Sequence, residues 1–269
     1  MKTFTDRWQQ LDWDDIRLRI NSKTSADVER ALNAPHPSRD DMMALLSPAA
    51  SAYLEPLAQR AQTLTRQRFG NTVSFYVPLY LSNLCANDCT YCGFSMSNRI
   101  KRKTLNETDI IRECAAIREL GFEHLLLVTG EHQAKVGMDY FRRHLPTIRQ
   151  QFSSLQMEVQ PLAEAEYAEL KTLGLDGVMV YQETYHDAMY AQHHLKGEKT
   201  GFLLAAGNPG PTGARRYRQN RPRGADWSFR QLAGGLLYGC RAFAVASAAL
   251  LAKPLLDFVP APASVRWRY

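Results

Sequence analysis

The pattern of apolar and polar residues changes near Thr72. Before it, apolar residues recur at the three- and four-residue spacing of amphipathic helices, as in the run from Leu54 to Leu64. After it, short apolar runs alternate with helical patterns, which is typical of a parallel α/β sheet. The sequence therefore predicts a helical N-terminal region at 1–72 and an α/β region at 73–199.

Capping residues predict where the helices of the first region begin. Thr24 or Ser25 is expected to cap a helix at 26–34, and Ser38 a helix at 39–46, each with acidic residues in its first turn. Pro56 lies inside a third helical pattern and predicts either a kink or a late helix start. This region suggests no chemistry, so we expect it to pack against the rest of the chain.

Four strands and three helices are expected after residue 72. The predicted strands cover residues 73–81, 124–131, 155–162 and 177–185, and the predicted helices cover 104–120, 139–151 and 163–173. Thr104 is expected to cap the first of these helices, with Glu107 at the capping-box position. Four βα units with right-handed crossovers begin a barrel. The predicted fold class is therefore α/β, a partial TIM-type barrel with a helical N-terminal region and an irregular C-terminal tail.

Chemically capable residues gather at the carboxyl ends of the predicted strands, where such barrels place their active sites. In chain order they are Cys85, Cys89 and Cys92, then Thr129, Gly130 and Glu131, then Gln160, and last Tyr181, Gln182 and Glu183. Two interpretations stay open for several of them. Glu131 could instead face solvent, and the last three could line the barrel or contact a substrate.

The three cysteines of the first strand end follow the spacing C-x3-C-x2-C. Three thiolates on one short loop can bind three corners of a cubane iron–sulfur cluster and leave the fourth iron open. A zinc knuckle is the alternative, but structural zinc sites usually take four ligands in paired groups. Cys114 lies on a predicted helix and is expected to be a buried apolar residue. His193–His194 is expected to be exposed loop.

The net charge of +6 is unevenly distributed along the chain. Residues 201–269 contain ten basic and two acidic residues, a balance of +8, which leaves −2 on residues 1–200. Nucleic-acid or zinc binding is disfavoured because the basic residues and the cysteines lie in different segments. No signal peptide is evident, and no apolar run approaches the roughly 18 residues of a membrane span. The five cysteines then favour a cytoplasmic metal site over disulfides.

Residues 1–199 resemble the 2-iminoacetate synthases, the tyrosine lyases of thiamine thiazole biosynthesis in the radical S-adenosylmethionine superfamily. The resemblance rests on the phrases SFYVPLYLSNLCANDCTYCGFS and LLLVTGEH, which include Tyr91, the aromatic residue before the third cysteine. It implies a [4Fe–4S] cluster on Cys85, Cys89 and Cys92 whose open iron binds S-adenosylmethionine. Tyr91 and the segment Thr129-Gly130-Glu131 are expected to contact this cofactor, although Thr129 replaces the first glycine of the family's G-G-E-type motif.

The activity implied by the resemblance is a radical cleavage of tyrosine. A 5′-deoxyadenosyl radical abstracts hydrogen, and the Cα–Cβ bond breaks to give 2-iminoacetate and p-cresol; methionine and 5′-deoxyadenosine accompany them. The resemblance assigns no catalytic side chain in this chain. It implies thiazole synthase as a partner. The basic run Arg99–Lys103 is either a solvated face or a docking patch for an acidic electron donor of the flavodoxin type.

The resemblance ends near Lys199. Residues 200–269 are rich in Ala, Gly, Pro and Arg without clear periodicity, and they contain none of the seven His and none of the eight Met. Codons chosen for residues 201–229 can be read one nucleotide later to give segments that resemble the family's own continuation. A frameshift near codon 200 is the hypothesis, and a genuine basic appendage is the alternative. A frameshifted chain would lack later barrel strands, so the second candidate function is a non-catalytic remnant that at most binds the cluster.

Overall fold

The computed structural model describes residues 8–181 and 183–202. The chain divides into two compact units. The described residues of the sheet unit are 8–9, 73–181, 183 and 187–202, and those of the helical unit are 10–72 and 184–186. The predicted tail, its frameshift and Gln182 lie outside the described residues. The division into segments 1–72, 73–199 and 200–269 stays a prediction.

The helical unit follows the capping signals of its sequence. Its elements are α2 (Trp13–Asn21), α3 (Ser25–Asn33), α4 (Arg39–Leu45), the 3-10 turn η1 (Pro48–Tyr53) and α5 (Leu54–Phe69). Thr24 and Ser38 cap α3 and α4 in capping boxes, as predicted. Pro56 lies in the first turn of α5, where a helical N–H has no partner to lose, so the late start is the correct alternative.

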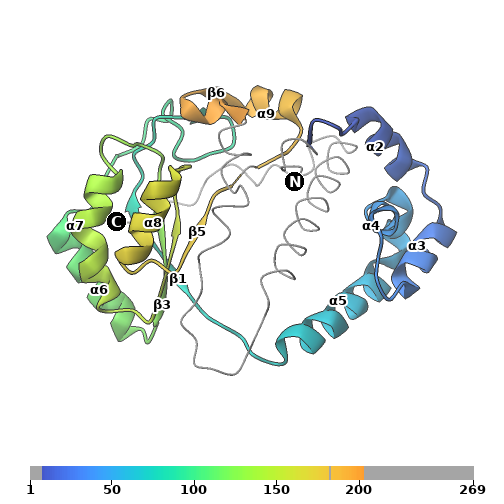
Figure 1. Cartoon of the computed structure of the whole chain (residues 1–269), viewed down its shortest axis with the longest axis horizontal. Helices are drawn as coiled ribbons and strands as arrows, with labels where there is room; N and C mark the ends of the chain where they lie inside the picture. Colours follow the sequence, from blue (N-terminus) through green and yellow to red (C-terminus); the bar gives the residue numbers. More distant parts are fainter. Residues whose placement is uncertain (1–7, 182, 203–269) are drawn as a thin grey trace. The chain divides into compact units, whose positions relative to one another are not determined.

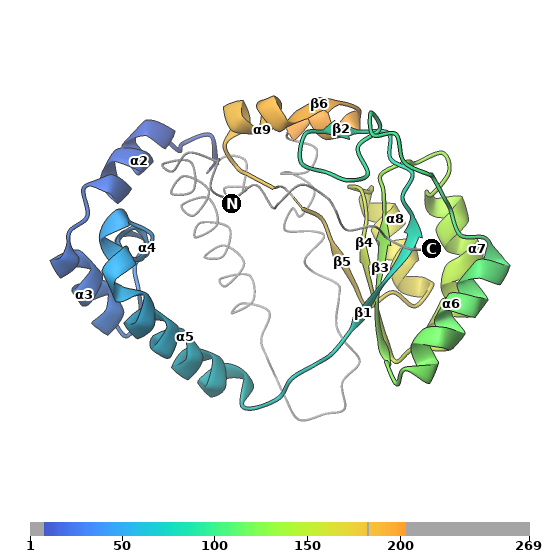
Figure 2. The same ribbon diagram turned by 180° about the vertical axis from the view of Figure 1, so that it is seen from behind.

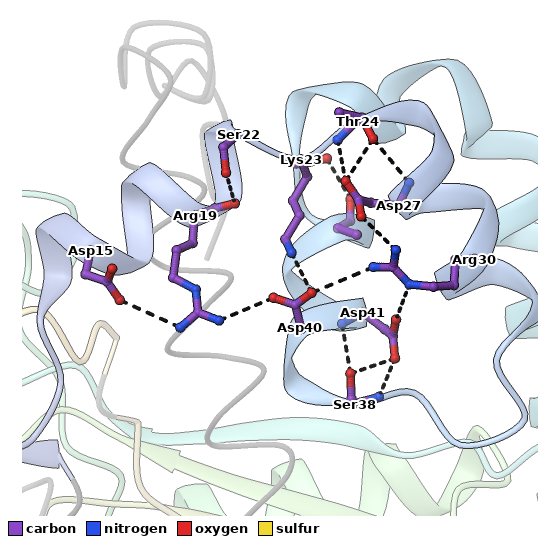
Figure 3. A network of polar contacts seen from close by, with 12 residues as sticks. Asp15, Arg19, Ser22, Lys23, Thr24, Asp27, Arg30, Ser38, Asp40 and Asp41 are labelled. Atoms are coloured by element: carbon purple, nitrogen blue, oxygen red, sulfur yellow. Dashed lines mark hydrogen bonds and ion pairs between the residues drawn. The ribbon is translucent and has the colours of Figure 1, made fainter.

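Ion pairs centred on one carboxylate join the helices of this unit (Figure 3). Asp40 of α4 lies 2.6 Å from Nζ of Lys23, 3.4 Å from a guanidinium nitrogen of Arg19 and 3.7 Å from one of Arg30. The hydrogen bond from Lys23 lowers the pKa of Asp40 below its ordinary value. Beneath them, apolar residues form two small clusters, which are Ile16, Ile20 and Met43, and Val28, Ala31, Ala44 and Ala50.

Four parallel strands form the centre of the sheet unit. They are ordered β1 (Val77–Ser82), β3 (His124–Thr129), β4 (Ser154–Glu158) and β5 (Gly177–Met179). The helices α6 (Glu107–Glu119), α7 (Met138–Arg149) and α8 (Glu164–Thr172) follow the first three strands and cover one face of the sheet (Figures 1 and 2). This order confirms the predicted α/β class, because neighbours in the sheet are also neighbours along the chain.

One continuous apolar core lies between the sheet and its helices. Alternate residues of each strand enter it; Leu79 and Leu81 are buried while Tyr80 between them is exposed. The helices contribute fully buried residues such as Phe141. Cys114 of α6 is in this core, which confirms its prediction as a buried apolar residue.

Two local predictions for this unit were wrong. Asn106, not Thr104, caps α6, because its side chain accepts the N–H of Asp109 and the Asp109 carboxylate accepts the N–H of Asn106 in return. Thr104 instead hydrogen-bonds to Ser82 at 2.8 Å between hydroxyl oxygens. The strands are also shorter than predicted, since their polar ends leave the hydrogen-bonded ladder and form loops.

A second, two-stranded sheet was not predicted. Strand β2 (Asp88–Cys89) pairs antiparallel with β6 (His194–Lys196), which follows α9 (Asp187–His193) and precedes the 3-10 turn η2 (Glu198–Thr200) (Figure 2). The prediction of exposed loop at His193–His194 is wrong, because His194 is only 3 % exposed. Within residues 8–181 and 183–202, no helix combines the length and apolar character needed to cross a membrane.

Candidate metal centre

The loop that follows β1 carries three free thiols. Cys89 is buried, and Cys85 and Cys92 are partly exposed. A backbone N–H approaches the sulfur two residues before it in two cases, Asn87 N to Cys85 Sγ at 3.5 Å and Phe94 N to Cys92 Sγ at 3.4 Å. Such N–H groups stabilise negative charge on sulfur, which is the form that binds metal.

The donor set of this loop fits a cubane cluster. Among the described residues, no three His, Cys, Asp or Glu side chains converge as the ligands of one metal ion. A cubane cluster needs no such convergence, because each thiolate binds a different iron. Burial raises the pKa of Cys89 to about 11, while the charge of Lys199 acts in the opposite direction. Its thiol must therefore lose a proton when it binds metal.

Arg102 fixes the shape of this cysteine loop (residues 84–95). Its guanidinium donates to the carbonyl oxygens of Asn83 at 2.7 Å, Phe94 at 2.8 Å, Ser95 at 2.7 Å and Asn98 at 3.2 Å. Arg102 is thus committed to the loop and is not part of a solvated face. Sequence reasoning missed this role because an arginine within a basic run looks the same whether its partners are water or carbonyls.

The turn after Cys89 is closed by a chain of hydroxyl contacts. The Cys89 N–H donates to Ser95 Oγ at 2.8 Å, and Ser95 donates to the Asp88 carboxylate at 2.5 Å. Ser97 donates to the same carboxylate oxygen at 2.7 Å. These bonds, that of Ser95 first, lower the pKa of Asp88. The buried cysteine is therefore held by a network of hydrogen bonds from neighbouring residues.

The end of β3 lies directly against the cysteine loop. The N–H of Gly130 donates to the Ser82 carbonyl at 2.9 Å, and the Glu131 carbonyl accepts the N–H of Ala86 at 2.8 Å. A Cβ at Gly130 would overlap the carbonyl of Leu84, so this approach requires glycine. The structure thus brings two of the predicted strand ends together, as parallel strands should.

The Glu131 side chain belongs to a buried charged group. Its carboxylate accepts from Asn87 Nδ2 at 2.8 Å and lies 3.8 Å from Nζ of Lys199, which also contacts Glu183 at 2.9 Å. Burial raises the pKa of Glu131, although Lys199 and Asn87 lower it. Burial lowers the pKa of Lys199, but Glu183 and Glu131 outweigh burial and raise it. Only 23 % of the Glu131 side chain is exposed, so it does not face solvent.

The remaining strand-end residues have different surroundings. Gln160 is buried, and neither amide atom finds a hydrogen-bond partner, a property shared by the Thr129 hydroxyl within the described residues. Tyr181 donates to Glu158 at 3.1 Å. Of the group Tyr181, Gln182 and Glu183, Glu183 is therefore the described residue tied to the charged group beside the cysteines.

Lys199 is the functional candidate that the sequence did not suggest. It lies 68 residues after Glu131 by number, outside every predicted strand end, and only the fold places its ammonium between two carboxylates. Asn87 was likewise passed over, although its amide contacts both Glu131 and the backbone of Lys199. The position of Asn87 inside the cysteine spacing was the one available signal.

Comparison with known proteins agrees with this geometry. Residues 79–206 match the Radical SAM superfamily. The 2-iminoacetate synthases of Salmonella typhimurium and Escherichia coli are each 84 % identical over 209 residues, which is 78 % of this chain and 55 % of theirs. The chain thus spans about half the length of the curated relatives it matches. A solved structure of the [FeFe]-hydrogenase maturase HydG from Carboxydothermus hydrogenoformans has 25 % identity and a TM-score of 0.68 over 76 % of this chain and 49 % of that one.

Proposed function

We propose that this chain is a member of the radical SAM superfamily, whose model matches residues 79–206, and that it acts as a carbon–carbon lyase that cleaves the Cα–Cβ bond of tyrosine to 2-iminoacetate and p-cresol. The observation that carries the proposal is the cysteine loop, three free thiols on one turn with backbone N–H groups aimed at two of the sulfurs. The high identity to 2-iminoacetate synthases supports the choice of substrate.

Cys85, Cys89 and Cys92 are the residues that would hold a [4Fe–4S] cluster. When bound, the cluster and S-adenosylmethionine supply one-electron reductive chemistry that no protein side chain provides. The chain's own part is to hold the thiols in one arrangement, to which the contacts of Arg102 and Ser95 contribute.

Glu131 is proposed to receive the ammonium group of S-adenosylmethionine, and Thr129 and Gly130 to line the same place. A carboxylate that is mostly buried and held by Asn87 is a preorganised acceptor for a cation. Lys199 neutralises part of that charge in the absence of ligand. Tyr91, a residue that is 50 % exposed, is proposed to contact the cofactor through its ring.

The partners follow from the resemblance and are proposals of the same kind. Thiazole synthase would receive the 2-iminoacetate. A flavodoxin-type electron donor would dock on the basic run Arg99–Lys103. Two cations of this run already have partners, because Arg102 binds the cysteine loop and Lys103 lies 3.2 Å from Asp109. Arg99 and Lys101 are exposed, as is Lys103.

Anaerobic reconstitution of the full chain with iron and sulfide tests the proposal. With S-adenosylmethionine, tyrosine and reductant added, the reaction should yield p-cresol and 5′-deoxyadenosine. Cluster absorbance without either product would support the alternative of a non-catalytic remnant. Replacement of Cys85, Cys89 and Cys92 together by alanine should abolish the absorbance, and Cys114→Ala should retain it; absorbance that survives the triple replacement defeats the site assignment.

A further inference from the structure

A strap made of residues 187–200 lies along the cysteine loop. Strand β6 pairs Cys89 with His194, and the N–H of Thr90 donates to the His193 carbonyl at 3.0 Å. Beyond β6, the N–H of Lys199 donates to Asn87 Oδ1 at 3.0 Å. The strap therefore contacts the loop on both sides of Cys89.

The imidazole of His194 makes two hydrogen bonds, one within the strap and one to the loop, and the direction of each can be assigned. Nδ1 lies 2.7 Å from the carbonyl oxygen of Tyr190, and Nε2 lies 2.6 Å from the hydroxyl of Tyr91. A carbonyl can only accept, so Nδ1 carries the proton. With Nδ1 protonated in the neutral ring, Nε2 accepts from Tyr91, and the tautomer of His194 is fixed.

Packing leaves this ring one orientation. His194 is 3 % exposed and stacks on the ring of Tyr190, with centroids 3.7 Å apart and an interplanar angle of 21°. Tyr190 is itself fixed, because its hydroxyl donates to the Lys199 carbonyl at 2.6 Å. Rotation of the imidazole would break both hydrogen bonds and the stack. In contrast, Tyr91 is 50 % exposed as a residue, so its hydroxyl is anchored while part of the residue stays accessible.

We propose that His194 is a positioning residue that holds Tyr91, and with it the turn from Cys89 to Cys92, in the arrangement that receives the cluster. His194 acts through the Tyr91 hydroxyl and the strap, and it touches no reacting atom. The inference rests on the proposed function, which supplies the cluster that the loop would receive. Outer partners of metal ligands act in this way in other sites, where they fix ligand orientation.

Four variants of the full chain separate positioning from general stability. His194→Asn keeps a donor near Nδ1 but leaves Tyr91 without an acceptor, while His194→Gln reaches the position of Nε2 and restores one. Tyr91→Phe removes the hydroxyl from the other side. Leu195→Asn, on the same strand with a side chain that is 54 % exposed, is the matched control.

The first readout is the retention of iron by the reconstituted chain. His194→Asn and Tyr91→Phe should lose iron to a chelator about tenfold faster than the parent chain, and both should change the paramagnetic resonance spectrum of the reduced cluster. The double variant should be no worse than either single change, because both remove the same bond. His194→Gln and Leu195→Asn should behave as the parent chain does.

The second readout uses metal-free protein, so it does not depend on cluster chemistry. Hydrogen exchange in peptides covering residues 84–94 should be faster in His194→Asn than in the parent chain or in Leu195→Asn. If the parent takes up no cluster, the proposed function fails while the exchange result still decides whether the strap holds the loop. If His194→Asn does not fold, Tyr91→Phe answers the same question. Exchange and iron loss equal to those of Leu195→Asn would overturn the inference.

Discussion

The two units of this chain use polar side chains in different ways. In the helical unit, charged groups meet other charged groups at the surface, as when Asp40 contacts Lys23, Arg19 and Arg30. In the sheet unit, Arg102 beside the cysteine loop binds backbone instead and contacts four carbonyls. Surface ion pairs add little stability, whereas bonds to backbone define the path of a loop. The ion pairs of the helical unit therefore serve packing, whereas the backbone contacts of Arg102 in the sheet unit fix the path of the loop that carries the candidate ligands.

The largest expected effect concerns the apolar core of the sheet unit. Phe141→Ala should lower the free energy of unfolding by about 3–5 kcal/mol, because it leaves a cavity in the one continuous core. Leu120→Ala, at a side chain that is 74 % exposed, should change it by about 0.5 kcal/mol or less. Chemical denaturation followed by circular dichroism measures both. Equal changes in the free energy of unfolding for the two variants would show that the apolar core does not determine the stability of this unit.

Loss of Arg102 should come next in size. Arg102→Ala removes the charged hydrogen bonds to backbone. One such bond contributes about 1.5–3 kcal/mol, and water can replace the guanidinium at the other carbonyls of this partly exposed loop, so a net loss of about 2 kcal/mol is expected in the unfolding free energy. Iron retention after reconstitution should fall as well. Arg102→Lys should recover only part of either quantity, because an ammonium cannot match the fork of a guanidinium.

Arg99→Ala is the matched control, since Arg99 is exposed in the same basic run. It should leave both the unfolding free energy and the iron content unchanged. A loss of iron in Arg99→Ala as large as that in Arg102→Ala would mean that the charge of the run, not the contacts of Arg102, maintains the loop.

A helix cap in the other unit should matter less. Ser38→Ala removes the side-chain oxygen that accepts the N–H of Asp41 at 3.1 Å and should cost about 1 kcal/mol. Ser38→Gly should cost only a few tenths of a kcal/mol, because glycine leaves the cap open to water. Thermal unfolding of the two variants side by side checks the order. The iron content should not change in either.

The smallest effect is a dependence of the helical unit on pH. The pKa of Asp40 is lowered by Lys23, so its contribution is fully present above the ordinary carboxyl pKa near 4 and is lost as pH falls through the lower folded value. The contribution is at most about 1 kcal/mol, because the Asp40 side chain is 42 % exposed.

Asp40→Asn should flatten this part of the acid limb of the stability curve, and added salt should weaken the same contribution. Bonds from Arg102 to carbonyls should not respond to pH in this range, because a carbonyl does not titrate. Hydrogen exchange measured across pH 5 to pH 3 compares the two units within one molecule. An acid-dependent opening of residues 10–72 that is unchanged in Asp40→Asn would contradict the role assigned to Asp40.

Local signals in the sequence were enough to predict the alternation of strands and helices. Apolar runs placed all four parallel strands, and Thr24 and Ser38 marked their helices correctly because capping depends on neighbours three residues away. The prediction of Thr104 as a cap was wrong because Asn106, two residues later, is also a capping residue and forms the capping box with Asp109. The choice between two nearby capping residues depends on the path of the preceding chain. Here the hydroxyl of Thr104 is hydrogen-bonded to Ser82, which local sequence does not reveal.

Of the candidate site, the sequence indicated the cysteine loop and the strand end beside it, and its role in metal binding stays a prediction. The spacing of the cysteines predicted the loop, and the parallel order of the sheet explains why Glu131 lies beside it. Contacts that depend on distant segments were missed, namely those of Arg102, Lys199 and His194. An arginine, a lysine and a histidine carry no local mark of their partners, and burial of His194 follows from a strand pairing of only two and three residues.

The pairing of β2 with β6 also orders events in time. Tyr91 and His194 are 103 residues apart along the chain. A ribosome adds about 5–20 residues per second, so the thiols are made roughly 5–20 s before the strap that packs against them. During that interval the three cysteines have been synthesised, but residues 187–200, which pack against their loop, have not. Delivery of iron and sulfide is therefore expected after residues 187–200 have emerged, and oxidation of the thiols is the competing reaction until then.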